Sequence, residues 1–170
     1  ATGSVGIKKD GSHNSSFQPG AELYAKSTVF AEGCSGSLSR EVIKKYSLAS
    51  RSDPQTYGLG IKELWRVPSR CCSKGRVTHT AGWPLGNKAF GGGFIYELSE
   101  DLVSVGLIIG LDYCNPYLDP FEEFQRFKSH PKIRPIFEGG RRVAYGARAR
   151  NEGGFQSIPK LICPGAAIIG

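Results

Sequence analysis

Sequence features typical of several protein classes are missing from this chain of 170 residues. No apolar run approaches the roughly 18 residues of a membrane-spanning helix, and the first residues lack the charged-then-apolar pattern of a secretory signal. These absences exclude a span within this stretch but leave association with a membrane open. Methionine is absent and histidine occurs only three times, with no evident partner for a Ser/His/Asp or Cys/His arrangement. We therefore assign no catalytic residue.

Cysteine is scarce and irregularly spaced, with five residues and no CxxC half-site. The odd number and the scattered positions argue against a disulfide framework and indicate a reducing compartment. The adjacent pair Cys71 and Cys72 is poorly placed to ligate one metal ion. We therefore predict no metal ligands in this stretch.

Glycine, in contrast, is abundant, with 23 residues, and it marks the central stretch from Thr78 to Tyr117. Between residues 103 and 111, branched apolar residues alternate with a second face that carries Gly106 and Gly110. The alternation predicts a strand that buries its branched face in a core. The other face leaves flat backbone on which a neighbouring chain or a planar ligand can lie close.

Three consecutive glycines, Gly91 to Gly93, lie between Phe90 and Phe94 just upstream. We predict a strand from 94 to 98 and a polar turn at 99–101, which join the next strand into an antiparallel hairpin. The glycine triplet is the most ligand-like feature of this hairpin, and plain hairpin geometry is the alternative reason for it.

The remaining elements predict an α+β fold, with a twisted, mostly antiparallel sheet and a few helices. A helix is expected from the N-cap Asp119 to His130, with three phenylalanines on one face. They are Phe121, Phe124 and Phe127. Strands are expected at 28–31, 56–65, 76–80 and 141–150, and an irregular hairpin is expected to join 5–8 to 22–26.

A strand, a glycine turn and a helix also follow one another from Thr28, with the helix beginning near Ser37. Four residues are expected to share the apolar face of this helix: Leu38, Val42, Ile43 and Tyr46. A turn of this kind aims free backbone N–H groups at an anionic or electron-rich ligand. Many α/β crossovers have the same turn and no ligand, so the signal is weak by itself.

Positive charge is concentrated toward the end of the chain. The net charge is +7, and the stretch from 121 to 150 holds eight Lys or Arg against three Glu. A basic balance is typical of proteins that bind nucleic acid, an anionic lipid surface or an acidic protein. An ordinary solvated surface is an equally good reading of such short, interrupted runs.

Several long motifs carry a resemblance to a known family. PQTYGLGIKELW, GWPLGNKAFGGGFIYEL and VGLIIGLDYCNPYLDPFEEFQRFKSHPKIRPIFEGGRRVAYGARARNEGGFQSIPKLICPG together resemble the electron-transfer flavoprotein:ubiquinone oxidoreductases. The earlier TVFAEGCSGSL is similar to the strand-turn-helix of the wider superfamily of flavoprotein hydroxylases and geranylgeranyl reductases. The resemblance covers essentially the whole chain.

The resemblance implies a flavin adenine dinucleotide (FAD), a 4Fe–4S cluster and a ubiquinone site in the intact protein. Electrons would pass from reduced electron-transfer flavoprotein to ubiquinone, at the matrix side of the mitochondrial inner membrane or at a bacterial cytoplasmic membrane. The ubiquinone-contacting glycine pair falls on Gly91 and Gly92, with Phe90, Gly93, Phe94 and Trp83 around it. Phe90 stands where relatives often have tyrosine. Five further residues would face the flavin: Glu32, Gly33, Asn151, Gly153 and Gly154.

Three departures from the family pattern imply that the chain is the middle of a longer protein. It has no GxGxxG turn for the adenosine diphosphate half of the flavin, no cysteine set for the cluster and no C-terminal membrane-associated segment. We expect a flavin-domain segment at 1–50, the ubiquinone-binding domain at 51–150, and a return to the flavin domain at 151–170. We expect the fragment alone to bind no cofactor except ubiquinone and to be inactive, and membrane contact to come from segments outside it.

Three alternatives remain open. The first is a related flavoprotein reductase or hydroxylase with a different acceptor. The second is a basic binding module that uses the stretch from Arg141 to Arg150, for which we expect weak and nonspecific nucleic-acid binding at most. In the third, the segment only provides a scaffold, and electron-transfer flavoprotein docks elsewhere.

Overall fold

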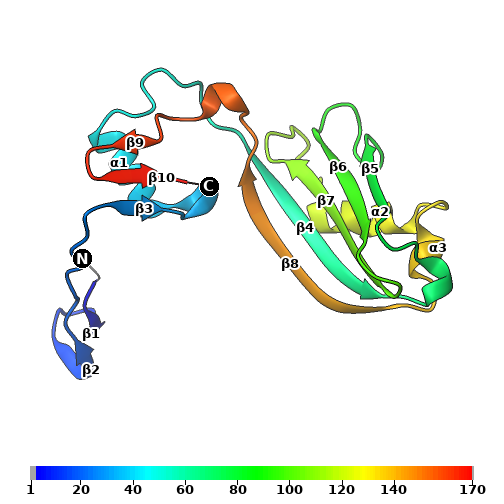
Figure 1. The fold of residues 1–170 in the computed structure, drawn as a ribbon, viewed down its shortest axis with the longest axis horizontal. Coiled ribbons are helices and arrows are strands. Elements are labelled where there is room, and N and C mark those ends of the chain that lie inside the picture. Colours follow the sequence, from blue (N-terminus) through cyan, green and yellow to red (C-terminus); the bar gives the residue numbers. More distant parts are fainter. Residues whose placement is uncertain (1–2, 170) are drawn as a thin grey trace.

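The computed structural model describes residues 3–169, apart from the side chain of Arg70, and shows two parts and a hairpin (Figure 1). The larger part is a five-stranded sheet with two helices. Its elements are β4 (Tyr57–Arg66), β5 (Val77–Ala81), β6 (Gly91–Glu97), β7 (Leu102–Gly110), α2 (Pro120–Ser129), α3 (Arg134–Phe137) and β8 (Arg141–Asn151). The smaller part holds β3 (Thr28–Phe30), α1 (Ser37–Lys45), β9 (Ile162–Cys163) and β10 (Ala166–Ile168).

The larger sheet has the strand order β5-β6-β7-β4-β8, and each neighbouring pair is antiparallel. This arrangement confirms the predicted α+β fold with a mostly antiparallel sheet. The hairpin of β6 and β7 is also confirmed, but β6 begins at Gly91 rather than at Phe94. The glycine triplet is therefore part of a strand and not a loop, because each of its residues has a partner on β7.

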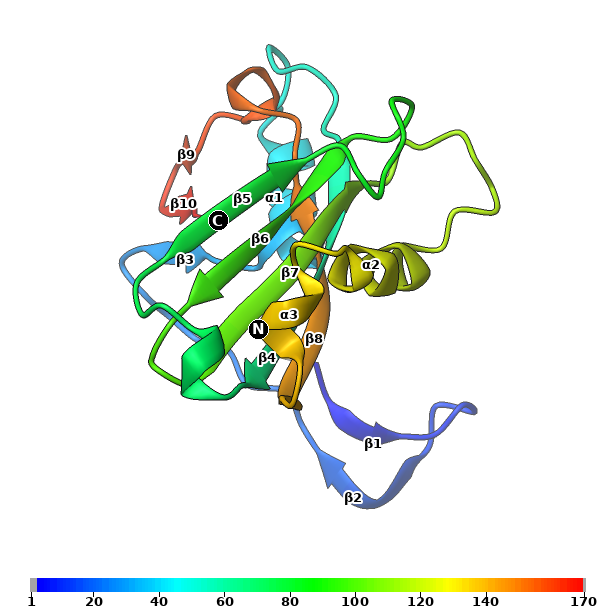
Figure 2. The same cartoon turned by 90° about the vertical axis from the view of Figure 1, so that its right-hand side faces the viewer.

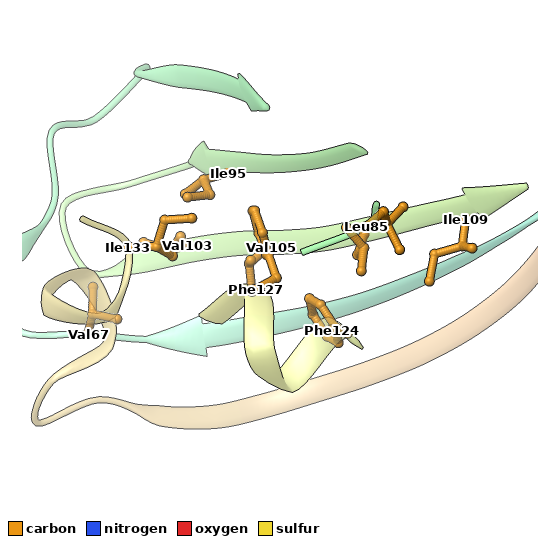
Figure 3. Close-up of a cluster of buried hydrophobic side chains, with 10 residues drawn as sticks. Val67, Leu85, Ile95, Val103, Val105, Ile109, Phe124, Phe127 and Ile133 are labelled. Carbon is orange, nitrogen blue, oxygen red and sulfur yellow. The ribbon is translucent and has the colours of Figure 1, made fainter. Parts of the chain in front are cut away.

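One face of the sheet carries the core, and α2 lies across it (Figure 2). The branched residues of β7 are fully buried there, as their alternation predicted. They are Val103, Val105, Leu107 and Ile109. Phe124 and Phe127 of α2 point into this cluster between the strands (Figure 3). Burial of large apolar side chains, worth about 2 kcal/mol each, thus attaches α2 to the sheet.

The limits of α2 agree with the sequence. Its N-cap Asp119 accepts hydrogen bonds from the backbone N–H groups of Phe121 and Glu122, and His130 is the C-cap. The predicted face of three phenylalanines is wrong in one member, because the side chain of Phe121 is 50% exposed. Burial begins only in the second turn, where the helix lies over the sheet.

The smaller part confirms the strand from Thr28 and the helix from Ser37. β3 pairs in parallel with β10, which pairs antiparallel with β9. The predicted apolar face of α1 is only half right. Val42 and Ile43 pack on the small core, but Leu38 is 53% exposed and Tyr46 is exposed too. Ser39 is buried in place of Leu38, since its N–H and hydroxyl groups both bind the Glu32 carboxylate.

The N-terminal hairpin pairs β1 (Val5–Ile7) with β2 (His13–Gln18). The predicted partner at 22–26 is therefore wrong. The true partner is almost entirely polar and exposed, so no apolar alternation marked it in the sequence. Within β2, Asn14 Oδ1 accepts hydrogen bonds from the N–H and hydroxyl groups of Ser16.

Candidate functional site

The face of the sheet opposite α2 is rich in glycine and has few branched residues. Strand alternation and register place six glycines on it: Gly58, Gly60, Gly92, Gly106, Gly110 and Gly146. Over this face lies a cavity of about 570 Å³, here called the sheet hollow. The residues that line it are Lys62, His79, Thr80, Ala81, Phe90, Gly91, Gly92, Gly93, Phe94, Tyr96, Ser104, Ile108, Arg150 and Glu152.

The three glycines of β6 are needed first by the packing of the sheet. A Cβ atom on Gly91 would collide with the carbonyl oxygen of Ile108, and one on Gly92 with that of Thr80. A Cβ atom on Gly93 would collide with the ring of Phe127 on the core side. By strand register only Gly92 faces the sheet hollow, and packing against a neighbour accounts for the glycine at all three positions.

Aromatic side chains form the walls of the sheet hollow. Phe90 is 71% exposed at one end, while Phe94 stacks on Tyr96 with 4.6 Å between ring centroids. Trp83, which was predicted to be a further wall, is absent from the lining and packs on His130 with centroids 4.8 Å apart. The structure thus brings together five of the six residues assigned to a quinone, and Trp83 lies outside.

Charged residues at one end of the sheet hollow were missed by the sequence reasoning. The Glu152 carboxyl lies directly over the Cα of Gly58, where a side chain on residue 58 would sit, and Arg150 Nε lies 3.5 Å from the position of a Cβ on Gly60. Burial, and secondly the nearby charge of Asp112, raises the pKa of Glu152. The bare faces of Gly58 and Gly60 were the available signal, because they make room for these side chains.

A second cavity, of about 750 Å³, lies between α1 and the end of β8 and is here called the junction cavity. Gly33, Asn151 and Gly154 line it, as three of the five residues assigned to the flavin. The other two are outside the lining, but each is hydrogen-bonded to a residue of it, Ser39 or Gln55. Glu32 accepts hydrogen bonds from Ser39 Oγ and N, which lower the pKa of its carboxyl, and the N–H of Gly153 donates to Gln55 Oε1 at 2.6 Å.

The redox groups that the chain can hold depend on the space in its cavities and on the side chains that could ligate a metal. Gly33 has φ of +68° with open space at its Cβ position, which leaves room for a planar ring in the junction cavity. Within residues 3–169, no group of three or more His, Cys, Asp or Glu side chains is placed to hold a metal ion. An iron–sulfur cluster therefore does not fit the described residues. None of the described helices is long and apolar enough to cross a bilayer.

Comparison with solved structures shows which known proteins share the fold. The chain superposes on the flavin-dependent brominase Bmp2 with a TM-score of 0.55 and 16% identity, covering 91% of this chain and 38% of that one. A triple mutant of that brominase gives a TM-score of 0.53 at 13% identity, covering 87% and 36%. The fold is thus one that flavin-dependent enzymes also have.

The sequence comparison defines the family. Residues 57–150 match the family described as ETF-QO, ubiquinone-binding, and the chain belongs to it. The chain is 58% identical over 172 residues to the human mitochondrial electron transfer flavoprotein-ubiquinone oxidoreductase, 51% identical to that of Dictyostelium discoideum, and 49% identical to a probable one of Schizosaccharomyces pombe. All of this chain is covered, but only 27–28% of each relative. The predicted resemblance is confirmed.

Proposed function

We propose that this chain is the ubiquinone-binding part of an oxidoreductase of the mitochondrion. The intact enzyme accepts electrons from reduced electron-transfer flavoprotein and passes them through FAD and a 4Fe–4S cluster to ubiquinone in the respiratory chain. The names of the relatives support the reaction and the compartment. The matrix side of the inner membrane and contact with its surface through segments outside this chain are further parts of the proposal.

The observation that carries the proposal is the sheet hollow. Its volume of about 570 Å³ lies in the range of small-molecule sites, which are mostly apolar with a few convergent polar groups. The rings of Phe90 and Phe94 and the bare backbone of Gly92 suit a flat quinone ring. His79 and Ser104 add hydrogen-bonding groups on the same face.

The junction cavity supports a flavin next to this site. Gly33, Asn151 and Gly154 would hold its ring, and the flavin would supply the electron transfer. The proposed boundaries at residues 50 and 150 are supported by the pairing of β3 with β10, which joins the two ends of the chain in one small sheet. The cluster and the adenosine half of the flavin belong to parts of the protein outside this chain.

A bulky residue at the open edge of the sheet hollow tests the proposal. Ala81 is exposed, pairs with Gly92 and lines the hollow, so in Ala81→Trp an indole would lie over the proposed ring position. Val77 lies on the same face of the same strand and is exposed, but it is outside the lining. Val77→Trp is therefore the matched control.

Both variants are made in the full-length protein. Reduction of the flavin by the electron-transfer flavoprotein and reduction of ubiquinone are the two half-reactions, and they are measured separately. We expect Ala81→Trp to lower kcat/KM for ubiquinone at least about tenfold, equivalent to about 1.4 kcal/mol, with normal flavin reduction by the electron-transfer flavoprotein. Val77→Trp should match the wild type in both. Unchanged quinone kinetics in Ala81→Trp would refute the sheet hollow as the quinone site, whereas absence of ubiquinone reduction in the wild type would favour a flavoprotein with another acceptor.

A further inference from the structure

Glu152 stands at the boundary between the two cavities. Its neighbours Asn151 and Gly154 line the junction cavity, whereas Glu152 itself lines the sheet hollow. Its backbone N–H donates to Thr56 O at 2.8 Å, which fixes the loop against the start of β4. The loop thus presents one carboxyl group to the quinone side while its other residues face the proposed flavin side.

The position of the Glu152 carboxyl depends on a glycine. The carboxyl group occupies the volume that a Cβ on Gly58 would fill, so the Glu152 side chain lies flat on the sheet. Asp112 is placed in the same way over Gly110, the partner of Gly58 on β7. The Asp112 carboxyl, which is outside the lining of the sheet hollow, therefore lies near the Glu152 carboxyl at this end, where the Cβ of Phe90 also lies against Gly110.

No structural partner holds the Glu152 carboxyl. Across residues 3–169, neither a hydrogen bond nor an ion pair engages its side-chain oxygens, although it is half-buried. The charged and titratable groups that face it or share its cavity are Asp112 in the turn after β7, Arg150 of β8, Lys62 of β4, His79 of β5 and Tyr96 of β6. A half-buried carboxyl without a structural bond, beside a second carboxyl, favours the protonated form.

The geometry points to Glu152 as the proton donor to the bound quinone, an inference that rests on the proposed function. Reduction of a quinone to a quinol requires two electrons and two protons. The electrons come from the reduced carrier of the proposed function. The O–H bond of the Glu152 carboxyl breaks as an O–H bond forms on one quinone oxygen. The resulting carboxylate regains a proton from solvent at the open side, and the second quinol proton comes from water.

The raised pKa of Glu152 gives this role a definite pH dependence. A general acid acts only while it is protonated. Because burial and the neighbouring Asp112 raise the pKa of the carboxyl, its proton is retained to a higher pH than in an exposed glutamate. The rate of quinone reduction is expected to fall as the pH rises through that pKa.

The test uses Glu152→Gln and Glu152→Asp in the full-length protein with its cofactors. Glu152→Gln keeps the shape but carries no ionisable proton, so kcat for quinone reduction should fall about 100-fold and the alkaline fall in rate should disappear. KM for ubiquinone and flavin reduction by the donor should stay as in the wild type. Glu152→Asp should restore part of kcat together with the pH dependence.

One control variant and three possible results distinguish failure of the proton-donor role from failure of the proposed quinone site. Glu100→Gln removes an exposed carboxyl in the β6–β7 turn and should change neither half-reaction. A wild-type kcat and pH profile in Glu152→Gln would overturn the proton donor. An equal loss of flavin reduction would also overturn it, by assigning Glu152 a structural or flavin-side role. Failure of the proposed function itself would appear in Ala81→Trp, whose quinone kinetics would then be normal.

Discussion

Glu63 offers the sharpest test of how the sheet and α2 hold together. Its side chain is 2% exposed, and its carboxylate accepts hydrogen bonds from Lys128 Nζ at 2.6 Å, Trp65 Nε1 at 2.7 Å and Arg142 Nη1 at 2.9 Å. These three donors belong to α2, β4 and β8. One carboxylate of β4 therefore connects this strand to α2 and to the edge strand β8.

Replacing Glu63 by glutamine removes the charge and keeps the size. Lys128, only 12% exposed, would then remain as a cation with no counter-charge. Loss of one partner of a buried ion pair costs about 3–5 kcal/mol. Since every 1.4 kcal/mol is a factor of ten, opening of α2 should become about 140- to 3,700-fold more frequent.

The same cluster predicts a pH dependence. Burial opposes ionisation of Glu63, but the bonds from Lys128, Trp65 and Arg142 outweigh it, so the pKa of its carboxyl lies below the ordinary value. A folded-state pKa below the unfolded one stabilises the protein above the unfolded pKa of about 4.3. This contribution to the free energy of unfolding is lost as the pH falls from there through the folded-state pKa.

Hydrogen exchange of the amides of α2 in the full-length protein measures the effect. Glu138→Gln is the control, because its ion pair with Arg134 is exposed and is worth at most about 1 kcal/mol. Exchange in Glu63→Gln that is accelerated no more than in Glu138→Gln would refute the argument that this carboxylate holds the helix.

Two further substitutions test local details. In Gly92→Val the new side chain should clash with the Thr80 carbonyl. This should lower the free energy of unfolding by about 1–3 kcal/mol and impair both half-reactions together. Gly86→Ala, in open space, should change neither thermal stability nor activity. Asp119→Ala should remove the N-cap of α2 at a cost of about 1 kcal/mol, seen as faster exchange of the first-turn amides. Asp119→Ser should restore the wild-type rate, and no difference between the two would contradict the capping role.

The sequence predicted those elements whose pattern is set by local chemistry. The buried branched residues of β7 recur at every second position from Val103 to Ile109 because one face of the strand meets the core, and Asp119 starts α2 because its side chain satisfies free N–H groups. Both patterns are periodic or local. Strand β2 has neither, since its residues are polar apart from Phe17 and nearly all are exposed, and its pairing was accordingly mispredicted.

The candidate site was predictable only in part, because its polar end is assembled from distant segments. Gly58, Gly110 and Glu152 come together through the pairing of β4 with β7 and with the end of β8, and no spacing in the sequence reports that pairing. Trp83 failed as a wall for the same reason, since its neighbour in space is His130 on the core side. Packing against Ile108 and Phe127 also explains why residues 91 and 93 are glycines, whereas the sequence pattern had linked them to a ligand.

The most direct test of the account is covalent labelling of the full-length protein with a photoreactive azido-ubiquinone. After digestion and mass spectrometry, the label is expected on the segment from Phe90 to Tyr96, which borders the sheet hollow, and excess ubiquinone should suppress it. Label that ubiquinone suppresses but that lies wholly outside the lining of the hollow would contradict the claim that this glycine-lined face receives the quinone.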